Sequence, residues 1–258
     1  MVSIGICGIA GRMGRLLAEE AVLAGATLAG GIDRPGTDAG ALPSGATLFP
    51  GVAALFAASD VVIDFTHASA AASHAAAAAE AGKAYVLGTT GLTLEEEAAV
   101  GAAAERAPIC YAANYSTGVN LVLAIAERMG ATLPPEQYDA EIVEMHHRQK
   151  VDAPSGTAIA MGRAVAKGRG RTLEEIGMES GRDGHTGARA TGPIGFAALR
   201  GGQVVGEHTL LFASATEHIS LTHRSFDRRA YASGAIRAAL WLHNRPAGLY
   251  SMKDVLGI

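Results

Sequence analysis

Short apolar runs and longer amphipathic patterns alternate along the first half of the chain. Runs rich in Val and Ile predict strands, and apolar residues that recur every three or four positions predict helices. The expected strands are residues 2–7, 27–32, 60–65, 83–87 and 108–112, and the expected helices are residues 12–25, 68–81 and 94–106. This alternation predicts a parallel sheet with helices on its faces, which is an α/β domain. Residues 34–58 are less regular and predict only a short strand near Leu48 and a brief helix.

The pattern changes after Gly118. Further strands are expected at residues 138–147, 193–199, 203–213 and 216–224, and helices at residues 118–130, 154–167 and 229–243. Residues 168–192 are rich in Gly and Arg and are expected to form a long polar loop. We therefore expect a second, α+β domain with an open mixed sheet over residues 117–228, while residues 1–116, completed by 229–258, form the α/β domain.

The composition is typical of a folded globular protein, because 49% of the 258 residues are hydrophobic and 18% are charged. A net charge of −4 gives no overall positive field for nucleic acid or an anionic membrane, so neither partner is expected. The apolar runs are too short to span a bilayer, and the first residues lack the pattern of a signal peptide. Cys7 and Cys110 lie in expected strands without the spacing of a redox or metal site, which favours a reducing, cytoplasmic setting.

The turn after the first strand is rich in glycine. Gly8-Ile9-Ala10-Gly11-Arg12-Met13-Gly14 lies where a Rossmann-like fold binds the pyrophosphate of a dinucleotide. Its spacing differs from the usual G-x-G-x-x-G and is a weak signal alone. Asp33 strengthens it, because an acidic residue at the end of the second strand can accept a hydrogen bond from the adenosine ribose. Arg34 can bind a 2′-phosphate, so we expect both NADH and NADPH as cofactors, with NADH modestly preferred.

Two other turns follow apolar runs in the same domain. Asp64-Phe65-Thr66 and Gly88-Thr89-Thr90-Gly91 both come at the carboxyl end of an expected strand. Open parallel sheets place their ligands at this edge. Each segment taken alone is equally consistent with an ordinary turn between a strand and a helix.

A dense group of ionisable residues lies in the second domain. His146, His147 and Lys150 can exchange protons near neutral pH or carry positive charge. Gly156 and Thr157 lie in the first turn of the helix expected at residues 154–167, and the free N–H groups of that turn can hold a carboxylate. Together these features predict a small anionic substrate. The alternative is a histidine pair at a strand end beside an ordinary capped helix. A third ligand with diagnostic spacing is lacking, so we expect no metal site.

The segment from Glu144 to Ala158, together with the glycine-rich turn, resembles the dihydrodipicolinate reductase family of the diaminopimelate route to lysine. The similarity also covers residues 112–120, 181–187, 194–196, 201–209 and 237–242, and so extends over nearly the whole chain. The resemblance implies NAD(P)H-dependent reduction of 4-hydroxy-tetrahydrodipicolinate, with loss of water, by a homotetramer that assembles through the sheet of the substrate domain.

The resemblance also implies roles for individual residues. His146 matches the general acid/base and Lys150 a second proton donor, while His147, Gly156 and Thr157 match residues that hold the substrate carboxylates. Arg228 matches more loosely a basic residue near the domain junction. The implied cofactor contacts are Gly8, Ile9, Ala10, Gly11, Arg12, Met13, Asp33, Arg34, Gly88, Thr89, Thr90, Ala112, Ala113, Asn114 and Tyr115.

Two other functions are compatible with the same residues. One is an NAD(P)H oxidoreductase that acts on a different small imine or aldehyde, against which the segment from Lys150 to Thr157 argues. The other is a nucleotide-binding sensor without turnover, which the intact proton-transfer residues disfavour.

Overall fold

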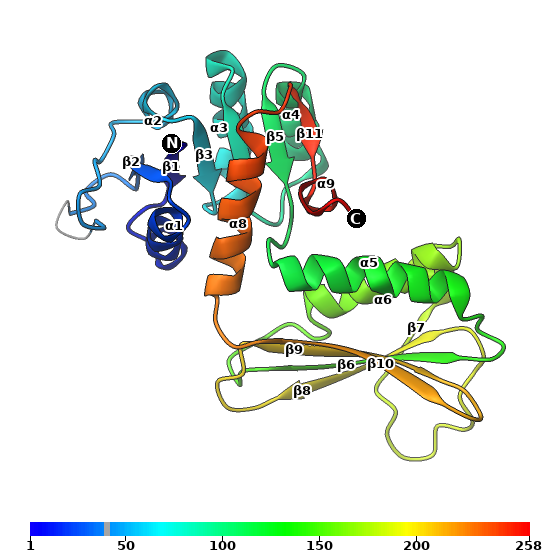
Figure 1. The fold of residues 1–258 in the computed structure, drawn as a ribbon. Helices are drawn as coiled ribbons and strands as arrows, with labels where there is room; N and C mark the ends of the chain where they lie inside the picture. Colours follow the sequence, from blue (N-terminus) through cyan, green and yellow to red (C-terminus); the bar gives the residue numbers. More distant parts are fainter. Residues whose placement is uncertain (39–41) are drawn as a thin grey trace. The chain divides into compact units, whose positions relative to one another are not determined.

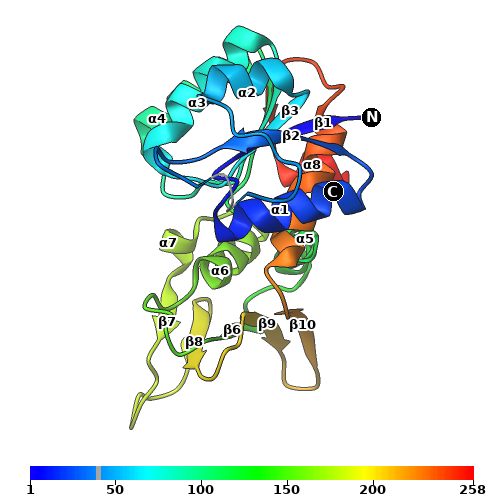
Figure 2. The ribbon, with the colours of Figure 1, turned by 90° about the vertical axis from the view of Figure 1, so that its left-hand side faces the viewer.

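The structure, a computed structural model, describes residues 1–38 and 42–258, and the chain forms two compact units (Figures 1 and 2). Unit 1 comprises Met1–Thr117 and Arg228–Ile258, and unit 2 comprises Gly118–Asp227. Within the described residues, every helix is too short or too polar to cross a membrane.

Unit 1 is built on a parallel sheet with the strand order β11-β5-β4-β3-β1-β2. Its strands are β1 (Ser3–Cys7), β2 (Thr27–Ile32), β3 (Val61–Asp64), β4 (Ala84–Leu87), β5 (Pro108–Tyr111) and β11 (Gly248–Tyr250). Its helices are α1 (Arg12–Leu23), α2 (Val52–Ala58), α3 (Ala68–Ala81), α4 (Leu94–Ala104), α8 (Arg229–Leu242) and α9 (Met252–Leu256). Helices α1 and α8 pack on one face, and α2, α3 and α4 cover the other (Figure 2). The expected α/β fold is confirmed.

The sheet of unit 2 has the order β10-β9-β6-β8-β7, and β6 runs parallel to β8 but antiparallel to β9. Its strands are β6 (Asp139–His146), β7 (Met178–Ser180), β8 (Ile194–Arg200), β9 (Gly206–Ala213) and β10 (His218–Ser225). Its helices are α5 (Thr117–Thr132), α6 (Gly156–Gly168) and α7 (Leu173–Ile176). Helices α5 and α6 lie over one face of this sheet (Figure 1). The expected open mixed sheet is confirmed.

Three expectations for local structure need correction. Residues 168–192 are not one continuous loop, because α7 and β7 lie within them. Helix α6 begins at Gly156 rather than at residue 154, because Ser155 is its N-cap and accepts a hydrogen bond from Ala158 N. Near Leu48 there is only an isolated parallel bridge to Gly31. At the start of α4, Thr93 and Glu96 form a capping box.

Candidate functional site

A cavity of about 710 Å³ lies in unit 1 at the carboxyl ends of β1, β2 and β3. The structure brings six of the expected cofactor residues together on its wall: Gly8, Gly11, Arg12, Met13, Asp33 and Arg34. The wall also contains residues that were not assigned to the cofactor, from the turn after β3 and from α3: Phe65, Thr66, His67, Ser69, Ala70 and His74. The sequence signal for this wall was the position of residues 64–66 at a strand end.

The glycines of the turn after β1 allow the backbone to pack tightly. Gly8 has φ +75°, a conformation that L side chains rarely adopt. A Cβ atom on Gly14 would lie 2.2 Å from the Gly8 carbonyl oxygen. Only glycine therefore lets the first turn of α1 lie against this loop, as a dinucleotide-binding turn requires.

Asp33 has a second role, which the sequence did not indicate. Its Oδ2 accepts a hydrogen bond from Ala10 N at 2.8 Å, and its Oδ1 accepts one from Arg34 N at 2.8 Å. The carboxylate therefore joins the end of β2 to the glycine-rich turn while it lines the cavity.

Positive charge surrounds the cavity. Arg12, Arg34 and Arg228 are exposed residues of its wall, and none of them forms an ion pair within the described part of the chain. Three guanidinium groups near one carboxylate favour an anionic ligand, and pyrophosphate is an anion that guanidinium groups bind well.

The other expected cofactor residues lie in the turns after β1, β4 and β5 or behind them. The Thr89 hydroxyl is buried and has no hydrogen-bond partner among the described residues, so it is available to a ligand. Ile9 is part of the core. The Tyr115 ring is also buried, its hydroxyl donates to Cys110 O at 2.7 Å, and its centroid lies 5.5 Å from that of Phe65. Tyr115 therefore packs against Phe65, which lines the cavity, but is not itself part of the cavity wall.

These features together fit a nicotinamide dinucleotide. The glycine cradle accommodates a pyrophosphate, the arginines offset its charge, and the unpartnered Thr89 hydroxyl is free to bond.

Unit 2 holds a second group of polar residues, centred on the carboxylate of Glu144. This side chain is 1% exposed and accepts hydrogen bonds from His146 Nδ1 at 2.7 Å, from Ser155 N at 3.0 Å and from the Arg200 guanidinium at 2.8 and 2.9 Å. Burial alone would raise the pKa of Glu144, but the hydrogen bonds from Arg200 and His146 outweigh it and lower the pKa. Glu144 is therefore an ionised anchor beneath His146.

The Glu144 carboxylate sets the orientation of the His146 ring. Because Nδ1 donates to Glu144, Nε2 is the ring nitrogen left for a ligand or a proton transfer. A Cβ atom on Gly206 would lie 3.0 Å from this Nε2, so glycine keeps the space beside it open. Sequence reasoning did not include Glu144 in the site, although it lies two residues before His146.

His208 lies beside His146, with 5.0 Å between their ring centroids, and its Nε2 is 2.9 Å from Ser155 Oγ. Burial, with a smaller effect from His146, lowers the pKa of His208 to about 4. His208 is therefore neutral near pH 7. His147, the next residue after His146, has a buried Nδ1 without a hydrogen-bond partner among the described residues.

Lys150 and the start of α6 complete this group. Lys150 Nζ donates to both carboxylate oxygens of Asp152, at 2.8 and 2.9 Å, a pairing that the sequence analysis did not anticipate. The Ser155 hydroxyl accepts a hydrogen bond from Ala158 N. The N–H groups of Gly156 and Thr157 lie in the first turn of α6, where a helix provides no acceptor of its own. The group thus offers a proton-transfer imidazole, an ammonium and a helix N-terminus suited to carboxylates.

Comparison with known proteins shows which family the chain resembles over its whole length. The family profile "Dihydrodipicolinate reductase, N-terminus" matches residues 2–115, and "Dihydrodipicolinate reductase, C-terminus" matches residues 118–256. A 4-hydroxy-tetrahydrodipicolinate reductase of Granulibacter bethesdensis is 61% identical over 257 residues, which span 100% of this chain and 97% of the relative. One of Acidiphilium cryptum is 58% identical over 99% of this chain and 97% of its own length.

Solved structures show the same fold. A dipicolinate-bound dihydrodipicolinate reductase from Paenisporosarcina sp. TG-14 has a TM-score of 0.78, with 24% identity over 98% of each chain. GenD2 from gentamicin A biosynthesis, solved in complex with NAD, has a TM-score of 0.61 and 14% identity over 99% of this chain and 90% of its own. The two profiles together match almost the whole chain and the relatives cover it fully, so this chain belongs to the dihydrodipicolinate reductase family.

Proposed function

We propose that this chain reduces 4-hydroxy-tetrahydrodipicolinate to tetrahydrodipicolinate with NADH or NADPH, with loss of water, in the diaminopimelate route to lysine. The observation that carries the proposal is the buried Glu144–His146 pair beside the N-terminus of α6, in a chain of this family. It combines proton transfer with the recognition of carboxylates, which reduction of a cyclic dicarboxylate requires.

The nicotinamide cofactor, when bound, supplies the hydride. The residues of the chain have three other tasks. His146 moves a proton at Nε2, because its Nδ1 is held by Glu144. Lys150 contributes positive charge and a second proton once its ammonium exchanges Asp152 for the substrate. His147, Gly156 and Thr157 hold the substrate carboxylates, in the way that a helix N-terminus binds anions.

The substrate is a small dicarboxylate, in keeping with the dipicolinate bound to the related reductase of Paenisporosarcina sp. TG-14. The active form is a homotetramer that assembles through the sheet of unit 2. The free thiols of Cys7 and Cys110 suit a reducing compartment, and we assign the protein to the cytoplasm.

A coupled assay tests the proposed function. Substrate is generated in the cuvette from pyruvate and aspartate semialdehyde, and oxidation of NADH is followed by absorbance. Turnover supports the proposal. NADH binding without turnover would instead favour a sensor, and turnover only with other imines or aldehydes in a substrate panel would favour a different oxidoreductase.

Two variants test the assigned roles. His146→Gln is expected to lower kcat by about 10²–10⁴, the usual effect of losing a general acid or base.

Lys150→Ala is expected to lower kcat and also to raise KM for the substrate, because the Lys150 ammonium both attracts the substrate carboxylates and donates a proton. Near-normal kcat in His146→Gln, or a change confined to the KM of the cofactor in Lys150→Ala, would remove the residue from its role.

A further inference from the structure

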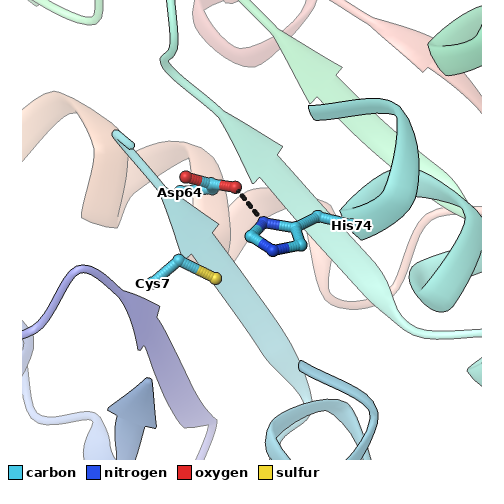
Figure 3. Close-up of side chains that lie close together, drawn as sticks. All are labelled: Cys7, Asp64 and His74. Atoms are coloured by element: carbon cyan, nitrogen blue, oxygen red, sulfur yellow. Dashed lines mark hydrogen bonds and ion pairs between the residues drawn. The ribbon is translucent and has the colours of Figure 1, made fainter. Parts of the chain in front are cut away.

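Asp64 is a buried acidic residue at the end of β3, in the second layer of side chains behind the cavity of unit 1. It is fully buried and accepts four hydrogen bonds. Its Oδ1 accepts from Thr66 N at 2.8 Å and from Thr66 Oγ1 at 2.6 Å. Its Oδ2 accepts from His74 Nδ1 at 2.6 Å and from Tyr85 OH at 2.7 Å, and Figure 3 shows the bond to His74.

These donors keep the carboxylate ionised. Burial alone would raise the pKa of Asp64, but the hydrogen bonds from His74 and Thr66 outweigh it and lower the pKa. A buried charge is stable only when its hydrogen-bonding capacity is met, so loss of one donor forces the carboxylate to move or to find another.

Cys7 lies next to this pair, so a metal site is the main alternative. Ligand atoms of Cys7, Asp64 and His74 lie within 4.8 Å of one another (Figure 3). However, both oxygens of Asp64 already accept two hydrogen bonds each. Burial and the Asp64 charge raise the pKa of the Cys7 thiol. The geometry therefore favours a hydrogen-bonded network over a metal centre.

The network fixes a turn that forms part of the cavity wall. Phe65 and Thr66, the residues of this turn, both line the cavity. A Cβ atom on Gly8 would lie 3.1 Å from Thr66 Cγ2, and one on Gly88 would lie 2.3 Å from the Phe65 ring. The turn thus fits closely between two glycine-containing loops, and a small displacement would narrow the space for a ligand.

We propose that His74 is a positioning residue for dinucleotide binding, which acts through Asp64 to hold the turn of Phe65 and Thr66 in the shape that the dinucleotide needs. Tyr85 acts through the same carboxylate from β4. This inference rests on the proposal that the cavity of unit 1 is the cofactor site.

A matched pair of substitutions at His74 tests the inference. In His74→Asn, the amide nitrogen takes the place of Nδ1 and can still donate to Asp64, whereas His74→Leu has a similar shape and no donor. The Kd of NADH for the full chain is measured by fluorescence titration without substrate. We expect a rise of about tenfold in His74→Leu and of less than about threefold in His74→Asn, with kcat at saturating NADH changed less than twofold in both.

Tyr85→Phe separates positioning from direct contact, because Tyr85 is fully buried and is not part of the cavity wall. The substitution removes the hydroxyl that donates to Asp64, so the Kd of NADH should rise by about threefold. Ser73→Ala is a change on the same helix, and among the described residues the Ser73 hydroxyl bonds only to Ala70 O, so this variant should leave the Kd unchanged. Thermal unfolding without ligand shows that each variant is folded.

Three results would overturn the inference. One is an unchanged Kd in a folded His74→Leu variant, and another is an equal rise in the Leu and Asn variants. The third is a rise at His74 with none in Tyr85→Phe, which would mean that His74 contacts the dinucleotide directly. Asp33→Ala tests separately whether the cavity of unit 1 binds the cofactor. If it does not, the Kd of NADH will be unchanged in Asp33→Ala as well; if it does, the Kd will rise in Asp33→Ala even when the His74 variants have no effect.

Discussion

At the scale of single residues, Glu144 connects the parts of the proposed substrate site. Its carboxylate contacts the imidazole of His146, the backbone at the start of α6 and the guanidinium of Arg200. Arg200 also donates to Asp152 O at 2.6 Å, and so holds the segment that carries Lys150. Several functional groups therefore depend on one buried charge, and its removal leaves partners unsatisfied.

Glu144→Gln is expected to lower kcat by about 10², part of the effect of losing His146 itself. The amide nitrogen of Gln would face a donor on Arg200 or His146, so the imidazole would lose its fixed orientation. Glu141→Gln is the control, because Glu141 lies on the same strand but pairs with Arg182 and Arg189. Steady-state kinetics of both folded variants gives the comparison, and equal kcat values would contradict the prediction.

We expect cofactor choice to depend on Asp33 and Arg34, which are neighbours in the sequence and both line the cavity. The carboxylate repels a 2′-phosphate and the guanidinium attracts it, so we expect both NADH and NADPH to be used, with NADH modestly preferred. The ratio of their kcat/KM values measures this balance. Arg34→Ala should lower kcat/KM for NADPH more than for NADH. An NADPH preference beyond about a hundredfold, about 2.7 kcal/mol, would contradict the assignment.

The sequence indicated the types of residue in the site better than their pairings. His146 and Lys150 stood out because they lie within five residues of each other and both can exchange protons or carry positive charge. The partner of Glu144, Arg200, is 56 residues away and is brought near only by the parallel pairing of β6 and β8. Such a pairing depends on which strands are neighbours and on their register. The hydrophobic pattern of a single strand does not determine either of these.

At the scale of elements, the long periodic segments were predictable and the short ones were not. Apart from the strand expected near Leu48, the strands and helices of the first half follow their expected ranges, because each buries a full apolar face. Strands β7 and β11 have three residues each, too few to show a period. Helix α7 did carry a local signal, since Thr172 and Glu175 form a capping box before Leu173.

The protonation of a histidine on strand β9 affects the free energy of unfolding. The strand buries His208, whose pKa is lowered to about 4 by burial first and by the charge of His146 next. Glu144 acts in the opposite direction, while His223 on β10 and Lys150 add smaller effects that lower the pKa. The folded state therefore prefers the neutral imidazole.

The sign of the pH effect follows from this preference. The pKa of His208 is lower in the folded chain than the ordinary 6.5, so its contribution to stability is complete above pH 6.5 and is lost as the pH falls toward 4. Its contribution to the free energy of unfolding should fall by at most about 1.4 kcal/mol per pH unit in that window. Urea unfolding between pH 7 and 5 measures this slope, which should be smaller in His208→Gln. An identical slope in the variant would assign the effect to other groups.

At the scale of the whole molecule, one face of the unit 2 sheet is covered by α5 and α6, and the described residues leave much of the other exposed (Figure 1). Val143 is 39% exposed and Leu199 is 51% exposed on that face, with Ala197 between them in the register of β6 and β8. Antiparallel and mixed sheets can present one face to water, but that face is then usually polar. These exposed apolar side chains share the face with polar ones such as Thr209 and Thr222, and we infer that the proposed assembly of several copies of the chain covers them.

Leu199→Glu should therefore disrupt the oligomer without unfolding unit 2, because the new charges would be buried without partners in the assembly but solvated in a single chain. Light scattering after size exclusion is expected to give about four times the 26.3 kDa chain mass for the unchanged protein and a smaller multiple for the variant. Val22→Glu, at a residue of α1 that is 62% exposed in unit 1, is the control and should keep the larger mass. If the unchanged protein has the mass of one chain, or if Leu199→Glu keeps the mass of four, the exposed face of this sheet is not the surface through which the copies assemble.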